Sequence, residues 1–291
     1  MPQTRWTLVG PDQRLAFAEI VRPHLELDPV RNTTVLSIVG RLPSDAREPR
    51  AEDCYGWWTD DAGHVRAAFA AQVPHAVTLS ADVPASAAAE LPQAWQDSGR
   101  ARPSGVFGPV EIAERIAADW AELVGGTYRE RPNHAMRLFS FAEPTPPNPA
   151  PRGTARLAML DEVNLATRWD VAFIEECSLV NDGADREPFV RVQIEGGRLL
   201  MWTVDGVPVA QAVHTPVIAG IARIVGVYTP PEHRRHGYAA SVTWAITHEA
   251  MAKGAERVLL HTDLSNPTSN AVYQRLGYRS VYDVTEFELA D

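Results

Sequence analysis

The feature that most constrains the fold is the stretch 224–262, in which a strand, a glycine-containing turn, a helix and a second strand follow in order. The turn consists of Arg234, Arg235, His236, Gly237, Tyr238 and Ala239. A helix is expected to begin near Tyr238. A helix start presents unpaired N–H groups and the positive end of the helix dipole, so the pattern predicts an anion site, with phosphate as the natural ligand. Gly237 lets the backbone approach that ligand closely.

The segment after this helix carries the second half of the signal. Residues 257–262 read as a buried strand, and Asn-Pro-Thr-Ser-Asn follows at 266–270. A short helix is predicted for 271–276, closed by Gly277 at its C′ position. Taken alone, the turn is equally compatible with an ordinary helix start. The second half shifts the interpretation toward a ligand site.

The whole series, ending in Leu-Gly-Tyr at 276–278, resembles the GCN5-related N-acetyltransferase (GNAT) superfamily. The resemblance covers about 205–287 and extends more loosely back to Arg152. It implies acetyl-CoA as cosubstrate, no metal, and direct attack of a primary amine on the acetyl thioester. The acceptor is expected to be a small molecule that the resemblance does not name.

The resemblance also implies which residues bind the cofactor. The splayed strand end would pair with the pantetheine amides; it consists of Val227, Tyr228 and Thr229. All six residues of the turn, 234–239, would hold the pyrophosphate, with Arg234 and Arg235 adding positive charge. Asn266 and Asn270 would contact the pantetheine arm.

Two groups are expected to act on the reacting atoms. Tyr273 would lie near the thioester sulfur and, as the family implies, act as the general acid that protonates the departing thiolate. The backbone N–H of Val227 would stabilise the developing oxyanion. The ordinary alternative for Tyr273 is a helix-face aromatic packed against the sheet, and the flanking motif favours the catalytic role.

The general base is less evident from the sequence. Many family members carry a Glu on the strand before the phosphate turn, whereas 222–228 contains no carboxylate. The candidates are His214, His261, and Glu175 or Glu176, each of which could equally be a packing or solvated residue; a water chain is a further alternative. The missing carboxylate also supports a second hypothesis, a non-catalytic acyl-CoA-binding sensor or interaction module.

Composition limits the partners and the location. The formal net charge of −10 argues against nucleic acid or an anionic membrane as a partner. No run approaches the length of a transmembrane helix, and no export signal is visible. Cys54 and Cys177 have no C-x-x-C spacing and are expected to be reduced thiols of a cytoplasmic protein. The sequence leaves the oligomeric state open.

The 291-residue length and a proline-rich segment predict two domains. Five prolines occur in the nine residues 143–151, which is typical of a stiff connector. We therefore expect domains at 1–142 and 152–291. In the second, a strand, helices, three antiparallel strands with a hairpin at Asp205-Gly206, a helix, a strand, a helix and a strand are expected.

The N-terminal half has a similar but less clearly marked order of predicted elements. A helix is predicted for 16–24, a hairpin around 61–63, a third strand at 73–80, a helix at 109–124 and a last strand at 135–141. The segment 80–86 lacks the phosphate motif. The expected fold class is therefore α/β (α+β), with two GNAT-like domains, each a mixed, mostly antiparallel sheet flanked by helices. The first would be degenerate and without a cofactor site; an unrelated α/β cap is the alternative.

Overall fold

The computed structural model describes residues 5–44, 48–179, 183 and 185–290. They form two compact units, 1–136 together with 282–291, and 137–281. The chain enters the second unit within β7 (Met136–Phe141) and returns to the first within β13 (Tyr278–Ala290). The expected division at 143–151 differs from these bounds, because the proline-rich segment lies inside the second unit and the last strand inside the first.

Long-range strand pairing explains this difference. Residues Val284 to Glu288 of β13 pair antiparallel with Pro109 to Gly105 of β5 (Gly105–Pro109), far away in the sequence. Local periodicity carries no signal for such a pairing. The strand expected at 135–141 consequently does not close the first unit, since most of β7 belongs to the second.

The first unit contains, besides the end of β13, the following elements: β1 (Trp6–Val9), α1 (Arg14–Leu25), α2 (Thr33–Arg41), β2 (Cys54–Thr59), β3 (Val65–Ala71), β4 (Val77–Leu79), α3 (Ala85–Asp97), β5, α4 (Val110–Val124) and β6 (Thr127–Glu130). Its strands lie in the order β1-β2-β3-β4-β5-β13, with β6 also pairing with β13. Only β4 and β5 are parallel among the register pairs described for this unit. Aromatic side chains fill the core, where Phe69, Trp95 and Trp120 pack in series.

The second unit contains most of β7 and the start of β13, with the following elements between them: β8 (Thr154–Leu157), α5 (Val163–Glu176), α6 (Glu187–Glu195), β9 (Leu199–Val204), β10 (Val207–His214), β11 (Ile221–Tyr228), α7 (Tyr238–Ala252), β12 (Arg257–Asp263) and α8 (Pro267–Arg275). Its strand order is β7-β12-β11-β10-β9-β8. β11 and β12 are parallel, while β8, β9, β10 and β11 are successively antiparallel.

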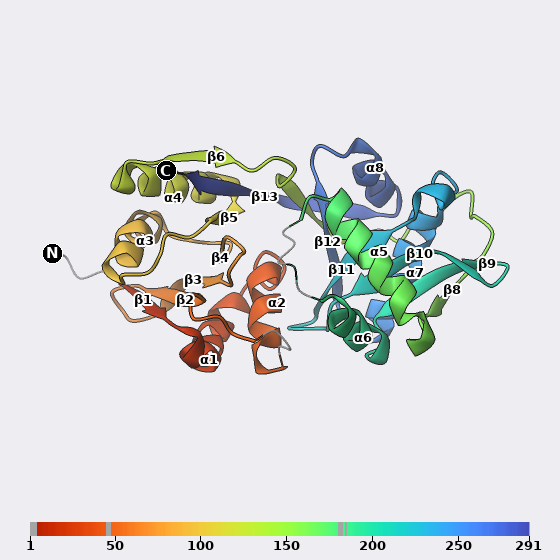
Figure 1. The fold of residues 1–291 in the computed structure, drawn as a ribbon, viewed down its shortest axis with the longest axis horizontal. Coiled ribbons are helices and arrows are strands. Elements are labelled where there is room, and N and C mark those ends of the chain that lie inside the picture. The colour runs from red at the N-terminus through yellow and green to blue at the C-terminus, as the bar shows by residue number, and fades with distance from the viewer. Residues whose placement is uncertain (1–4, 45–47, 180–182, 184, 291) are drawn as a thin grey trace. The chain divides into compact units, whose positions relative to one another are not determined.

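Helices cover both faces of this second sheet, as Figure 1 shows with α5 in front of β11 and α7 behind it. The apolar stripe of α7 packs on one face, where Val242 and Ile246 are fully buried against Ala222 and Ile224. On the other face, Val225 and residues of β9 and β10 pack with α5 and α6. The side of α7 that meets the sheet therefore carries Val242, Ile246 and Ala250, all fully buried.

Several predicted elements are confirmed, and some bounds are corrected. The hairpin turns at Asp205 and Gly206, both with positive φ. β11 begins at Ile221, directly after a left-handed turn at Ala219 and Gly220. α8 begins at Pro267 instead of 271, because the side chain of Asn266 caps it. Helices α2, α3 and α6 were not predicted.

The two units repeat one order of elements. In each, a first strand is followed by two helices, a hairpin, a strand, a helix, a strand parallel to the preceding one and a further helix. The pair β4 and β5 of the first unit corresponds in this order to β11 and β12 of the second. The expected fold class, a mixed α/β fold with mostly antiparallel strands flanked by helices, is confirmed, although the strands of the described residues belong to one continuous sheet and not to two.

Candidate active site

The centre of the candidate site is the opening between β11 and β12 in the second unit. Their parallel pairing is described from Ile221 with Arg257 to Ile224 with Leu260, and β11 continues to Tyr228 without a further described pair to β12. The backbone of Val227 and Tyr228 therefore lies beyond the last pair. Two parallel strands that separate in this way leave main-chain donors and acceptors facing a gap, which an extended ligand can fill.

A β-bulge on the other edge of β11 shapes this opening. Val225 pairs with Val213 and Tyr228 with Gln211, so three residue steps on β11 match two on β10. Gly226 sits inside the bulge with φ of +57°. Glycine takes such a φ without strain, and bulges re-aim the residues that follow them.

The bulge reverses the alternation of side chains along β11. Val225 packs with the cluster beneath α5, whereas Val227 packs with the cluster beneath α7. Without the bulge, residues two apart on a strand would share a face. The reversal turns Tyr228 toward α5, where its ring lies 6.4 Å from that of Trp169.

The predicted phosphate turn is an open helix start. A short 3-10 turn at Pro231–His233 leads to Arg235 and Gly237, whose φ angles are +65° and +83°. Gly237 is the N-cap of α7, and no side chain caps the helix. In the described part of the chain, the N–H groups of Arg235, His236 and Gly237 have no hydrogen-bond acceptor. Free N–H groups at the start of a 15-residue helix are suited to an anion.

Side chains around the turn divide into paired and unpaired ones. Arg235 is exposed and has no hydrogen bond or ion pair among the described residues. The rings of His236 and Tyr238 stack with their centroids 5.4 Å apart. Ala239 lies in the first turn of α7. A Cβ at Gly237 would lie 3.8 Å from Pro151, so the end of the proline-rich segment lies beside the turn.

Arg234, by contrast, is bound to α5. Its Nη2 donates to both carboxylate oxygens of Glu176, at 2.8 and 2.6 Å, and its Nε donates to the carbonyl oxygen of Thr229 at 2.9 Å. The hydroxyl of Tyr228 donates to the same carboxylate at 3.2 Å. Hydrogen bonding to Glu176 raises the pKa of Arg234, while burial and the Glu176 charge raise the pKa of Tyr228.

The segment between β12 and α8 holds an unsatisfied acceptor. The amide nitrogen of Asn270 donates to the carbonyl oxygens of Asp263 and Asn266, at 3.0 and 2.9 Å, which fixes the orientation of the amide. Its Oδ1 is buried without a partner, as is Oγ1 of Thr229. Buried polar atoms without partners are costly, so these two are suited to a ligand's amide or hydroxyl groups.

The side chain of Asn266 caps α8. Its Oδ1 accepts the N–H of Ser269 at 3.0 Å, and Pro267 occupies the first position of α8. This arrangement caps the helix. The structure therefore gives the two asparagines of the motif separate tasks, one at the helix start and one facing the strand end.

Tyr273 lies on α8 with its ring partly buried and edge-on to Tyr278, at 6.1 Å between centroids. Burial raises the pKa of Tyr273 to about 12, with a smaller effect from the nearby Cys177. A phenol with this pKa keeps its proton at neutral pH, as a general acid must. Cys177 is a free thiol at the end of α5, and burial together with Glu176 and Asp263 raises its pKa. Local sequence patterns do not indicate that Cys177 lies near Tyr273.

The candidates for the general base differ in position, pKa and ion pairing. His214 lies at the opposite end of the sheet, near Lys253 and Glu249 at the end of α7, and burial lowers its pKa. His261 follows the last parallel pair, but burial and Arg223 lower its pKa to about 3, so it is a poor proton acceptor at neutral pH. The Glu176 carboxylate is held by Arg234. Glu175 is exposed and makes no described side-chain contact.

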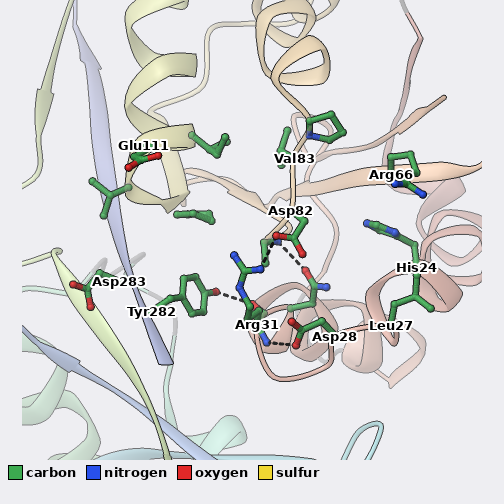
Figure 2. Close-up of a pocket in the computed structure, with 16 residues that line it drawn as sticks. His24, Leu27, Asp28, Arg31, Arg66, Asp82, Val83, Glu111, Tyr282 and Asp283 are labelled. Atoms are coloured by element: carbon green, nitrogen blue, oxygen red, sulfur yellow. Dashed lines mark hydrogen bonds and ion pairs between the residues drawn. The ribbon is translucent and has the colours of Figure 1, made fainter. Parts of the chain in front are cut away.

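The first unit has a hollow of about 790 Å³ at the corresponding ends of β4 and β5. Asp82 and Pro84 line it from the segment before α3, in the place that the phosphate turn takes in the second unit. Figure 2 shows Arg31 between Asp82 and Tyr282; its guanidinium donates to Asp82 at 2.6 Å and lies 5.3 Å from the tyrosine ring.

The chemistry of this hollow differs from that of the open turn. Its carboxylates are Asp28, Asp82, Glu111 and Asp283, and a proline takes the N-cap position of α3. Carboxylates beside a helix start disfavour a phosphate through like-charge repulsion. Arg31 and Arg66 also line the hollow, so its charge is mixed, and the segment 80–86 contributes Asp82 where the turn of the second unit contributes two arginines.

Comparison with known proteins identifies the second unit. Residues 163–278 match the model of the acetyltransferase (GNAT) family. This part of the chain is therefore a GNAT domain. Among curated proteins, no sequence matches the chain.

Solved structures share the fold along the whole chain. A GNAT-family acetyltransferase from Colwellia psychrerythraea is 12% identical with a TM-score of 0.61, covering 97% of this chain and 98% of its own. A GCN5-related N-acetyltransferase from Sphaerobacter thermophilus is 14% identical with a TM-score of 0.61, over 99% and 97%. A tandem GNAT protein from the clavulanic acid biosynthesis pathway is 14% identical with a TM-score of 0.54, over 99% and 98%.

The described residues contain neither a membrane-spanning helix nor a group of side chains suited to a metal ion. No helix there is both long and apolar enough to cross a bilayer. No group of three or more His, Cys, Asp or Glu side chains in that part of the chain is arranged to hold a metal ion.

Proposed function

We propose that the protein is an N-acetyltransferase that moves the acetyl group of acetyl-CoA onto a primary amine of a small molecule. The observation that carries the proposal is the opening between β11 and β12, which has an unsatisfied acceptor on Asn270 and a protonated phenol on Tyr273 beside it. The GNAT domain at 163–278 supports the same reaction class.

The residues around the opening fit the cofactor. The free N–H groups of 235–237 and the start of α7 suit a pyrophosphate, and the unpaired Arg235 adds a positive charge beside them. The buried Oδ1 of Asn270 suits a pantetheine N–H, and the unpaired strand end at 227–229 suits the pantetheine amides. When bound, acetyl-CoA supplies an activated thioester carbonyl.

Acetyl transfer by direct attack requires few catalytic groups from the protein. Holding the amine in line with the thioester supplies most of the rate. The backbone N–H of Val227 stabilises charge on the carbonyl oxygen. Tyr273 gives its proton to the sulfur as the C–S bond breaks, and water takes the proton that the attacking amine loses. No side chain is assigned as the base, because Glu176 is ion-paired and the pKa of His261 is about 3.

We further propose that the first unit is a GNAT-like domain without a cofactor. The carboxylates in its hollow and the ion pair of Arg31 with Asp82 support this assignment. The free thiols of Cys54 and Cys177 are compatible with a cytoplasmic location.

The test is release of CoA thiol in the presence of acetyl-CoA and a panel of small primary amines. We expect release with at least one amine, and Tyr273→Phe should lower kcat by about 10²–10⁴-fold while leaving acetyl-CoA affinity unchanged. A Tyr273→Phe variant with full activity would contradict the general-acid role.

The ion pairing of Glu176 and the low pKa of His261 favour a second candidate, an acyl-CoA-binding module without turnover. Binding of acetyl-CoA without thiol release across the panel would favour this alternative. A protein that binds no acetyl-CoA would exclude both.

A further inference from the structure

The ion pair between Glu176 and Arg234 joins two parts of the site that the proposed function treats separately. Glu176 is the last residue of α5, and Arg234 is the first residue of the phosphate turn. Three described hydrogen bonds meet at this corner, since Arg234 binds both carboxylate oxygens and Tyr228 binds one of them. Neither partner is buried, because their side chains are 42% and 45% exposed.

The pairing leaves the turn with less charge than its sequence suggests. Two arginines stand in the turn, yet only Arg235 has no described partner. Arg234 directly precedes the residues 235–237, whose backbone N–H groups are free. The positive charge of its guanidinium is neutralised by the Glu176 carboxylate. An anion that binds these N–H groups is therefore next to the Arg234 guanidinium, which is already paired with the Glu176 carboxylate.

We propose that Glu176 and the pyrophosphate of acyl-CoA compete for the Arg234 guanidinium, so that cofactor binding frees the Glu176 carboxylate. This inference rests on the proposed function, since it requires acyl-CoA in the second unit. An exposed ion pair contributes little free energy, whereas arginine and phosphate form a strong charge-assisted pair. The exchange is therefore energetically accessible.

The freed carboxylate would remain in the site. The hydroxyl of Tyr228 still holds it on the α5 side of β11. Its charge raises the pKa of the adjacent Cys177, whose thiol lies near Tyr273. The exchange thus places a free negative charge on the side of the cleft that carries Tyr273, where it would attract a cationic amine only after the cofactor has bound.

Calorimetric titration with CoA tests the competition through affinity. Glu176→Gln removes the competitor, so CoA should bind up to about fivefold more tightly, which corresponds to about 1 kcal/mol. Arg234→Gln should weaken CoA binding. In the Arg234→Gln background, Glu176→Gln should have no further effect, because no guanidinium is left to compete for.

Two controls separate this mechanism from a general loss of negative charge. Glu175→Gln removes the same charge one residue earlier, at an exposed side chain without described contacts, and should leave CoA affinity nearly unchanged. S-acetylpantetheine, which lacks the pyrophosphate, should bind wild type and Glu176→Gln equally. Thermal unfolding of each variant checks that it folds, and Arg234→Lys provides a second, conservative variant that loses the two-oxygen contact.

The outcomes distinguish the inference from the proposed function. Tighter CoA binding by Glu176→Gln that disappears in the double variant would support the competition. Equal or weaker CoA binding by Glu176→Gln, or the same gain with Glu175→Gln or S-acetylpantetheine, would overturn it and leave the acetyltransferase assignment intact. Wild-type protein that binds no CoA would instead contradict the proposed function.

Discussion

The N–H of Glu143 donates a hydrogen bond of 3.1 Å to the carbonyl oxygen of Gly277. Ala142 makes the same bond, so the start of the proline-rich segment is attached to the end of α8. Gly277 has a φ of +97°, and a Cβ built on it would lie only 1.6 Å from the Glu143 carbonyl oxygen. The Leu-Gly-Tyr motif therefore fixes the connector to the helix that carries Tyr273.

This contact predicts that Gly277→Ala destabilises the second unit severely. The positive φ alone costs about 1–3 kcal/mol for a residue with a Cβ, and the collision with the connector adds to it. Gly254→Ala is the matched control, since Gly254 has a φ of +93° with nothing within 4 Å of its Cβ position. Urea unfolding should show a larger loss for Gly277→Ala than for Gly254→Ala. Equal losses would mean that the connector contact is unimportant.

The two asparagines should respond differently to truncation. Asn266→Ala removes a helix cap and should cost about 1 kcal/mol of stability with little change in CoA affinity. Asn270→Ala removes the donor bonds to Asp263 and Asn266 and the unsatisfied Oδ1, so it should lower both stability and CoA affinity, the latter by about tenfold. Titration of both variants measures this difference, and equal affinities would argue against a ligand contact at Asn270.

Stability should fall in acid because of His261. Its folded-state pKa is lowered to about 3, below the ordinary 6.5, so the unfolded chain binds a proton that the native chain does not. The stability is fully present above pH 6.5 and is lost as the pH falls toward 3. His261→Phe should reduce the slope of stability against pH by close to one proton. An unchanged slope in His261→Phe would contradict the lowered pKa of His261.

Acetyl-CoA should bind with one site per chain. Gly237→Glu places a carboxylate at the N-cap of α7 and should abolish binding through repulsion of the pyrophosphate. Gly206→Glu introduces the same residue at a similar φ in the exposed hairpin, with nothing near its Cβ position, and should bind normally. Calorimetry that gave two sites per chain would contradict the proposal that the first unit lacks a cofactor site.

Much of the second unit could be predicted because its signals are local. The hairpin at Asp205-Gly206, the stripe of α7 and the glycines at 237 and 277 each follow from the conformation of a few neighbouring residues. The bulge at Gly226 also has a local signal, because a glycine between two valines in a strand often marks a bulge. The start of α8 was placed too late, because Asn266 was considered as a ligand contact and not as a cap.

The sequence by itself determined the order of strands and helices from 198 to 278, the open helix start at Gly237 and Tyr273 as the candidate acid, because backbone conformation and capping depend on residues close together in the chain. Only the tertiary structure decided that Arg234 is paired with Glu176, that His214 lies far from the turn, and that the last strand belongs to the first unit. Each of these depends on contacts between residues distant in sequence. Local sequence patterns and propensities do not specify such contacts, because the contacts form only when distant strands pair and helices pack on the sheet.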